Sequence, residues 1–230
     1  MQKREIANYG YAVLVLLLGI VLLLTAWPRV IGSINHLPVE LAINDLNNQK
    51  DLDAQKVDNL ITTAQQSIAL YDHPRYWADL SRLLLFQAEK TTSLELRQSL
   101  LKQSQYSIEQ SLARSPANSF LWFQLARLDV LLNSVSDKTV KALNLSIMTG
   151  PYELGHLLPR LQLCLGLLYK FDVKDHFLLQ SQILIAWQKA PALFKEVAIK
   201  NNNMNKIRFL LQNKSADVLA VMETKIEKAH

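Results

Sequence analysis

The apolar positions of this chain form one unbroken run near the N-terminus and a series of shorter, periodic segments after it. Residues 11–26 contain no charged residue. With Tyr9 and Trp27 the run reaches about 19 residues, which as a helix would span about 28 Å, close to the thickness of the hydrocarbon core of a bilayer. Aromatic residues stand at both ends of the run, where their rings favour the membrane interface. We therefore predict a transmembrane anchor at residues 11–27.

The charges that flank this run predict its orientation. Lys3 and Arg4 precede it, whereas Arg29 is the only basic residue that follows it before Lys50. Basic residues favour the cytoplasmic side, so residues 1–10 are expected to form a short cytoplasmic head. The rest of the chain would then lie outside the cytoplasm, in a single-pass protein of the inner (cytoplasmic) membrane. A cleaved signal peptide is less favoured because the apolar run is long and residues 24–26 match a cleavage site poorly.

Two prolines follow the apolar run. Pro28 lies in the sequence Trp27-Pro28-Arg29 and is expected to end the membrane helix, because proline cannot donate a helical hydrogen bond. Residues 28–52 are then interpreted as a connector. Within it, residues 37–46 could form a short amphipathic helix after Pro38.

Residues 53–230 are predicted to form an all-α domain. Their apolar residues recur at helical spacing, and no window shows the sustained alternation typical of strands. The helices are expected at residues 53–71, 76–89, 94–114, 120–132, 138–149, 175–190, 193–200, 206–212 and 216–229, with a further buried helix after residue 154. Ser136 or Asp137 would cap the helix at 138–149, and Gly150 would end it in a left-handed conformation. Short connections between these helices predict antiparallel neighbours.

One short pattern occurs twice. Trp-x-x-Leu-x-Arg-Leu is found at residues 77–83 and again at residues 122–128, and a degraded third copy ends in Leu158-Pro159-Arg160-Leu161. Pro116 and Pro151 lie 35 residues apart. These features indicate helix-turn-helix repeats.

The pattern resembles tetratricopeptide repeats, units of about 34 residues with Trp-x-x-Leu and a small residue early in the first helix and proline after the second. Trp122, Leu125 and Ala126 follow that register after Pro116, whereas Ser81 replaces the small residue in the copy at Trp77. The resemblance implies an α-solenoid of antiparallel helix pairs. The equivalent arginines are spaced by 45 and 33 residues, which predicts an irregular solenoid.

A second resemblance concerns residues 142–153, ALNLSIMTGPYE, together with Arg160. This stretch is similar to small, single-pass repeat proteins encoded among bacterial exopolysaccharide synthesis and export genes. The resemblance implies an accessory role in an envelope glycan machine and brings no active site with it.

The repeated arginines are the candidate binding residues. Arg82, Arg127 and Arg160 each follow an apolar repeat position, so stacked repeats could align them as a ridge that binds carboxylates or phosphates. The alternative is that each one pairs with a neighbouring helix end or carboxylate. Dense basic clusters are absent although the net charge is +5, which disfavours nucleic-acid binding.

The sequence offers little for catalysis or metal binding. None of the five histidines has a histidine or cysteine at i+3 or i+4, and phosphate-loop and nucleophile-elbow motifs are absent. Cys164, the single cysteine, lies in an apolar helical run and is interpreted as a core residue. We therefore predict no catalytic, metal or cofactor site and no small-molecule substrate.

The expected function is a non-catalytic, membrane-anchored scaffold that binds protein partners of an envelope complex through its helical-repeat surface. Exopolysaccharide synthesis or export is the process suggested by the second resemblance. The alternatives are a helical enzyme acting on an envelope polymer, which would need convergent carboxylates, and a membrane-tethered periplasmic chaperone.

Overall fold

The computed structural model describes residues 2–48, 50–212 and 216–227, and within these ranges it contains helices and no strand. The all-α prediction is confirmed for this part of the chain. The α-helices are α1 (Gln2–Asn47), α2 (Ala54–Leu70), α3 (Pro74–Lys90), α4 (Leu94–Arg114), α5 (Ser119–Leu131), α6 (Asp137–Thr149), α7 (Leu154–Gly166), α8 (His176–Lys189), α9 (Pro191–Ile199), α10 (Asn203–Leu211) and α11 (Ala216–Glu227). Short 3-10 turns cover Leu168–Lys170, Val173–Asp175 and Lys200–Asn202.

The chain divides into two compact units, Met1–Arg114 and Ser115–His230. The helical domain predicted at residues 53–230 therefore contributes to both. Most predicted helices lie within two or three residues of the observed ones, and the prediction for residues 94–114 coincides with α4.

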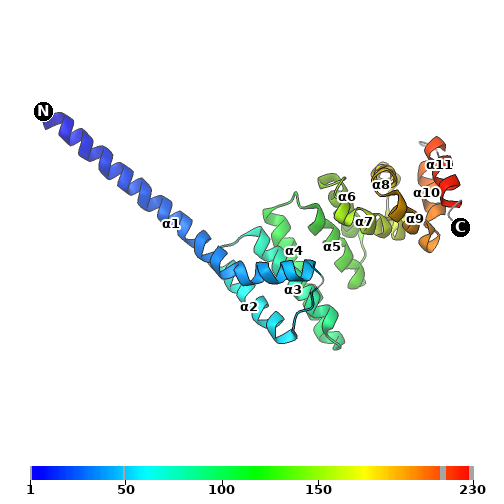
Figure 1. Cartoon of the computed structure of the whole chain (residues 1–230), viewed down its shortest axis with the longest axis horizontal. Helices are drawn as coiled ribbons and strands as arrows, with labels where there is room; N and C mark the ends of the chain where they lie inside the picture. The colour runs from blue at the N-terminus through cyan, green and yellow to red at the C-terminus, as the bar shows by residue number, and fades with distance from the viewer. Residues whose placement is uncertain (1, 49, 213–215, 228–230) are drawn as a thin grey trace. The chain divides into compact units, whose positions relative to one another are not determined.

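The first helix is longer than predicted. α1 continues through Pro28 and Pro38 to Asn47, so the prediction that the helix ends at Pro28 is wrong, and residues 28–47 are helical instead of a mixed connector. Its N-terminal part projects away from α2, α3 and α4 (Figure 1). All of residues 13–30 are exposed. This helix is long and apolar enough to cross a membrane.

Packing on other helices explains why α1 continues beyond the prolines. Val39, Ala42 and Ile43 are buried in the core of the first unit. The Asn35 side-chain amide donates to the Ser67 hydroxyl of α2 at 3.0 Å, and the buried His36 ring stacks on Tyr76 of α3. These contacts stabilise a helix that proline weakens locally. α1 also changes direction along its length, as helices with internal prolines do (Figure 1).

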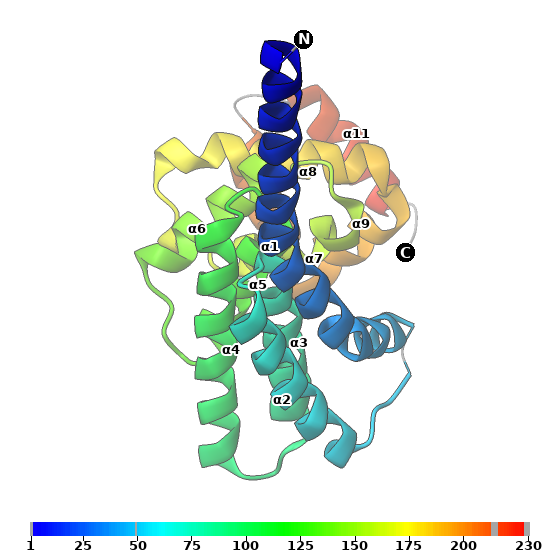
Figure 2. The same cartoon turned by 90° about the vertical axis from the view of Figure 1, so that its left-hand side faces the viewer.

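The hairpin of α3 and α4 is the centre of the first unit. The Ser104 hydroxyl donates to the Ser81 carbonyl at 2.9 Å, and the Ser111 hydroxyl donates to the Pro74 carbonyl at 2.7 Å. Residues late in α4 thus contact residues early in α3, which defines an antiparallel pair. α2 packs on the other side of α3 and beside the C-terminal part of α1 (Figure 2).

The second unit begins with the antiparallel pair α5 and α6. The Ser146 hydroxyl donates to the Ser119 carbonyl at 2.7 Å, and the Thr139 hydroxyl donates to Asp129 at 2.7 Å. Helices α7 to α11 complete one apolar core. Its fully buried members include Leu143, Leu157, Leu165, Leu179, Ile183, Phe194, Ile207, Leu211 and Met222.

The start of α6 agrees with the sequence prediction, and the residue that ends it differs from the prediction in one respect. Ser136 caps the start of this helix in a capping box with Thr139, which resolves the choice between Ser136 and Asp137. Gly150 follows the helix as predicted, but its φ is −156°, so it is not left-handed. A Cβ on Gly150 would lie 2.4 Å from the Ser119 hydroxyl oxygen, so close packing is what requires a glycine here.

Candidate binding groove

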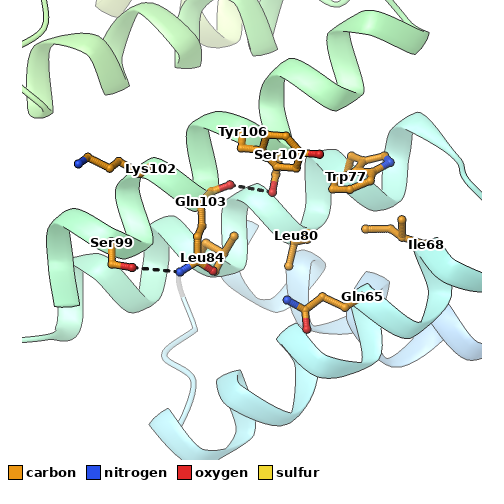
Figure 3. Close-up of a pocket in the computed structure, with 10 residues that line it drawn as sticks. All are labelled: Gln65, Ile68, Trp77, Leu80, Leu84, Ser99, Lys102, Gln103, Tyr106 and Ser107. Atoms are coloured by element: carbon orange, nitrogen blue, oxygen red, sulfur yellow. Dashed lines mark hydrogen bonds between the residues drawn. The ribbon is translucent and has the colours of Figure 1, made fainter.

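An apolar groove of about 490 Å³ lies between α2, α3 and α4 in the first unit (Figure 3). Its lining residues come from three consecutive helices that are joined by short connections. They are Gln65 and Ile68 of α2, Trp77, Leu80 and Leu84 of α3, and Ser99, Lys102, Gln103, Tyr106 and Ser107 of α4. The volume falls in the range of about 300–1,000 Å³ that is usual for ligand-binding clefts.

The floor of the groove is apolar and rigidly held. Leu80 and Leu84 are almost completely buried, being side chains of the α3 face that packs in the core. Ile68 lines it from α2. Because these side chains belong to the packed hairpin, the groove is preformed.

Two aromatic residues form one end of the groove. The Trp77 and Tyr106 rings meet edge to face, with centroids 5.9 Å apart and an interplanar angle of 81°. The Trp77 indole N–H donates to Asp72 at 2.7 Å, and the Arg114 guanidinium lies 5.5 Å from the Trp77 ring centroid. Trp77 is therefore fixed from three sides, while Tyr106 remains largely exposed.

The charges around Trp77 also fix the ionisation of Asp72. Hydrogen bonds from Arg114 and then from Trp77 hold the pKa of Asp72 below its ordinary value. This carboxylate is thus charged at neutral pH and keeps the indole in place.

The other end of the groove is polar. The Gln103 side-chain amide donates to the Ser99 hydroxyl at 3.2 Å, and Lys102 extends from the same helix (Figure 3). Lys102 is the only charged residue in the lining. It takes part in none of the ion pairs formed by residues that the structure describes. The groove therefore combines an apolar floor, an aromatic end and one cation at its rim.

The three arginines predicted from the repeats lie in different surroundings. Arg82 belongs to the first unit, is half-buried, and donates to the Asn47 side chain at the end of α1. Arg127 and Arg160 belong to the second unit. Arg127 is also half-buried, donates to Gln124 at 2.9 Å, and lies 5.9 Å from the Phe123 ring centroid.

Arg160 is fully buried and holds the end of α6. Its Nη1 donates to the Ser146 carbonyl at 2.7 Å and to the Gly150 carbonyl at 3.1 Å, while Nη2 contacts Gly150 and Gln182. A cation is favoured here because the last carbonyls of a helix carry partial negative charge. Burial lowers the pKa of Arg160 to about 10, so it stays protonated at neutral pH. Arg160 therefore does not belong to an accessible ridge. It pairs with the end of a helix, which was the alternative interpretation.

A serine and a histidine meet in the second unit. The Ser119 hydroxyl and Nε2 of His156 are 3.0 Å apart, beside a surface cavity of about 530 Å³. Both side chains are buried, and burial lowers the pKa of His156. Among the hydrogen bonds of the described residues, none joins the other ring nitrogen to a carboxylate. This hydrogen bond joins the start of α5 to α7.

Cys164 lies in the core of the second unit, as predicted, and burial raises the pKa of its thiol to about 12. In the described part of the chain, no group of three His, Cys, Asp or Glu side chains is placed to hold a metal ion.

The groove was not predicted from the sequence. Trp77 and Leu80 were identified as repeat residues, but Tyr106 and Lys102 belong to no repeated pattern. Only the antiparallel packing of α3 and α4 brings them together.

Comparison with known proteins gives no match to a family model, to a curated protein or to a solved structure.

Proposed function

We propose that this protein is a non-catalytic adaptor, anchored by α1 in the cytoplasmic membrane, that binds a segment of a partner protein in the groove between α2 and α4. The observation that carries the proposal is the preformed apolar groove, in the same compact unit as a helix able to cross a membrane. A single-pass protein with such a groove can hold a partner close to the bilayer.

The chemistry of the groove defines the segment it would bind. An amphipathic helix could place a large apolar side chain against Leu80 between Trp77 and Leu84, as in other helix-in-groove complexes. A carboxylate on the same segment would pair with Lys102. The partner segment is therefore expected to be amphipathic and acidic on one side.

The process that we propose for this adaptor is based on the sequence resemblances. The stretch at residues 142–153 supports a role in bacterial exopolysaccharide synthesis or export. The basic residues before the span support an N-terminus in the cytoplasm and an extracytoplasmic helical region. The partner would then be an envelope protein of that pathway.

Site-specific photo-crosslinking in native membranes tests the proposal. Gln65 and Gln66 are both exposed glutamines of α2, but only Gln65 lines the groove. A photoreactive residue at position 65 of the full-length protein should give one discrete adduct, and the same residue at position 66 should give none. Mass spectrometry should place the crosslink in an amphipathic segment of the partner, and Lys102→Glu should reduce the yield.

Three results would count against the adaptor. Equal labelling at positions 65 and 66 would show that the groove is not the binding surface. A broad ladder of adducts would favour the chaperone alternative. A crosslinked small molecule or glycan, in place of a protein, would favour the enzyme alternative.

A further inference from the structure

The connection between α2 and α3 lies against α1 directly after its apolar run. We name residues Leu70, Tyr71, Asp72 and His73 the α2–α3 corner. The Arg29 guanidinium lies 5.6 Å from the centroid of the Tyr71 ring. A Cβ added to Gly32 would lie only 2.9 Å from the Cβ of Tyr71, so the two backbones approach closely.

The length of α1 places this corner relative to a membrane. The apolar run ends at Trp27, an aromatic residue of the type found at the membrane interface. Gly32 follows five residues later, about 7.5 Å further along the helix at 1.5 Å per residue. The headgroup layer on each side of the hydrocarbon core is about 5–7.5 Å thick, so 7.5 Å reaches its outer edge. Tyr71 therefore lies at the level of the lipid headgroups if α1 crosses the bilayer.

The surface chemistry of the α2–α3 corner suits contact with lipid headgroups. Leu70 is 46% exposed, and Tyr71 is an amphipathic ring of the kind enriched at membrane interfaces. Arg29 is exposed and takes part in none of the ion pairs between described residues. The one carboxylate of the corner, Asp72, is already paired with Arg114. The corner thus offers an apolar side chain, and the adjacent Arg29 of α1 offers a guanidinium that stacks on Tyr71 and is not in an ion pair with any described residue. A guanidinium binds phosphate well.

The opposite end of the first unit provides a comparison. α3 has 17 residues, so its two ends are about 25 Å apart. Leu94, after the far end of α3, is 68% exposed, and the neighbouring Lys90 pairs with Asp51 at 2.9 Å. The α2–α3 corner lies at the end of the unit beside the projecting part of α1, and the α3–α4 connection lies at the other end (Figure 2).

We propose that the α2–α3 corner rests on the surface of the bilayer, with Leu70 among the headgroups and Arg29 bound to a lipid phosphate. The first unit is then held on the membrane in one orientation, because α1 enters it as a continuous helix without a flexible linker. This inference rests on the proposed membrane anchoring, and the experiment below separates the two.

Quenching of an environment-sensitive fluorophore by spin-labelled lipids tests the contact. The full-length protein is reconstituted in vesicles that contain anionic phospholipid, with Cys164 replaced by alanine. One new cysteine is labelled in each variant, Leu18→Cys in the apolar run, Leu70→Cys at the corner or Leu94→Cys at the far end. We expect acyl-chain labels to quench position 18, headgroup labels to quench position 70, and neither to quench position 94.

The variants distinguish the possible failures. Quenching at position 18 with no more quenching at position 70 than at position 94 would overturn the inference and leave the anchoring intact. No quenching at position 18 would overturn the anchoring itself. Arg29→Gln should lower the quenching at position 70, and Arg29→Lys should restore part of it. An unchanged signal in Arg29→Gln would contradict the phosphate contact.

Discussion

Helices α3 and α5 carry the two copies of the repeated pattern, one in each unit, and they begin in the same way. His73 and Asn118 cap them through side-chain acceptors, and a tryptophan occupies the fourth helical position of each. Both indoles donate a 2.7 Å hydrogen bond to the segment before the helix, Trp77 to a carboxylate and Trp122 to a carbonyl. The pattern thus builds the same helix start twice.

The surfaces that follow the two copies are different. Leu84 lines the apolar groove of the first unit, and the residue at the equivalent position of α5, 45 residues later, is Asp129, which accepts a hydrogen bond from Thr139 of α6. The same pattern therefore fixes how a helix begins, while residues outside the pattern determine whether its surface becomes a groove or a polar helix contact.

The largest expected effect concerns the arginine of the degraded third copy. Arg160→Met would remove the donors to the end of α6 and leave buried carbonyls without partners. We expect a loss of about 3 kcal/mol in the stability of the second unit, which corresponds to a roughly hundredfold faster hydrogen exchange in α7. Exchange of α4 in the same full-length protein serves as the internal reference.

Arg127→Met is the matched control for this variant. Arg127 is only half-buried and makes local contacts, so its loss should cost about 0.5 kcal/mol. Equal effects of the two substitutions would show that the two arginines do not differ in their structural role.

The sequence predicted helices better than surfaces, for physical reasons. Periodic apolar residues are a local signal, and the predicted helices agree closely with α2 to α6. The end of α1 was predicted wrongly because Pro28 and Pro38 are local signals for the end of a helix. The packing of α1 on α2 and α3, which stabilises the longer helix, involves residues distant in the sequence. Arg160 was similarly identified by its repeat position, and its burial depends on the α6 end and Gln182.

A smaller effect is expected at the turn after α6. In Gly150→Ala the new methyl group would meet Ser119 at 2.4–2.6 Å and the Glu153 side chain at 2.8 Å. The φ of Gly150 is accessible to alanine, so the whole cost is overpacking, about 1–3 kcal/mol. Hydrogen exchange of α5 and α6 would measure it.

Gly155→Ala gives the opposite expectation. A Cβ at Gly155 meets no atom within 4 Å, and alanine favours a helix, so α7 should gain up to about 1 kcal/mol. A loss of stability in Gly155→Ala would contradict the open space around that position. No loss in Gly150→Ala would contradict the close approach of α5 and the turn after α6.

The second unit should also lose stability in mild acid. Burial, and then the charge of Arg160, lower the pKa of His156 below its ordinary 6.5, so the unfolded chain binds a proton that the folded chain does not. By linkage, stability is full above pH 6.5 and falls as the pH decreases below it. Urea unfolding at pH 7.5 and 5.5, read by pulse hydrogen exchange at a fixed labelling pH, would measure this change.

Two variants identify the cause of that pH dependence. His156→Gln should give a flatter profile between the two pH values. Ser119→Ala should keep most of the slope, because burial is the main cause of the shift and the hydrogen bond is not. An equally steep profile in His156→Gln would assign the acid sensitivity to another group.

The smallest expected effect is a difference between Trp77 and Trp122 in their response to salt and acid. The pKa of Asp72 is held below 3.8 by Arg114 and Trp77, so the stabilisation by this carboxylate is present above pH 3.8 and is lost as the pH falls through the lowered pKa. The ion pair is largely exposed, so Asp72→Asn should cost less than about 1 kcal/mol, and less at high salt. Trp122 donates to the uncharged carbonyl of Pro116 and should respond to neither salt nor acid in this range. Single-tryptophan versions that retain Trp77 or Trp122 would report the difference by fluorescence. A salt response of equal size at both tryptophans would contradict this expectation. It would show that the charge of the acceptor does not distinguish the two helix starts.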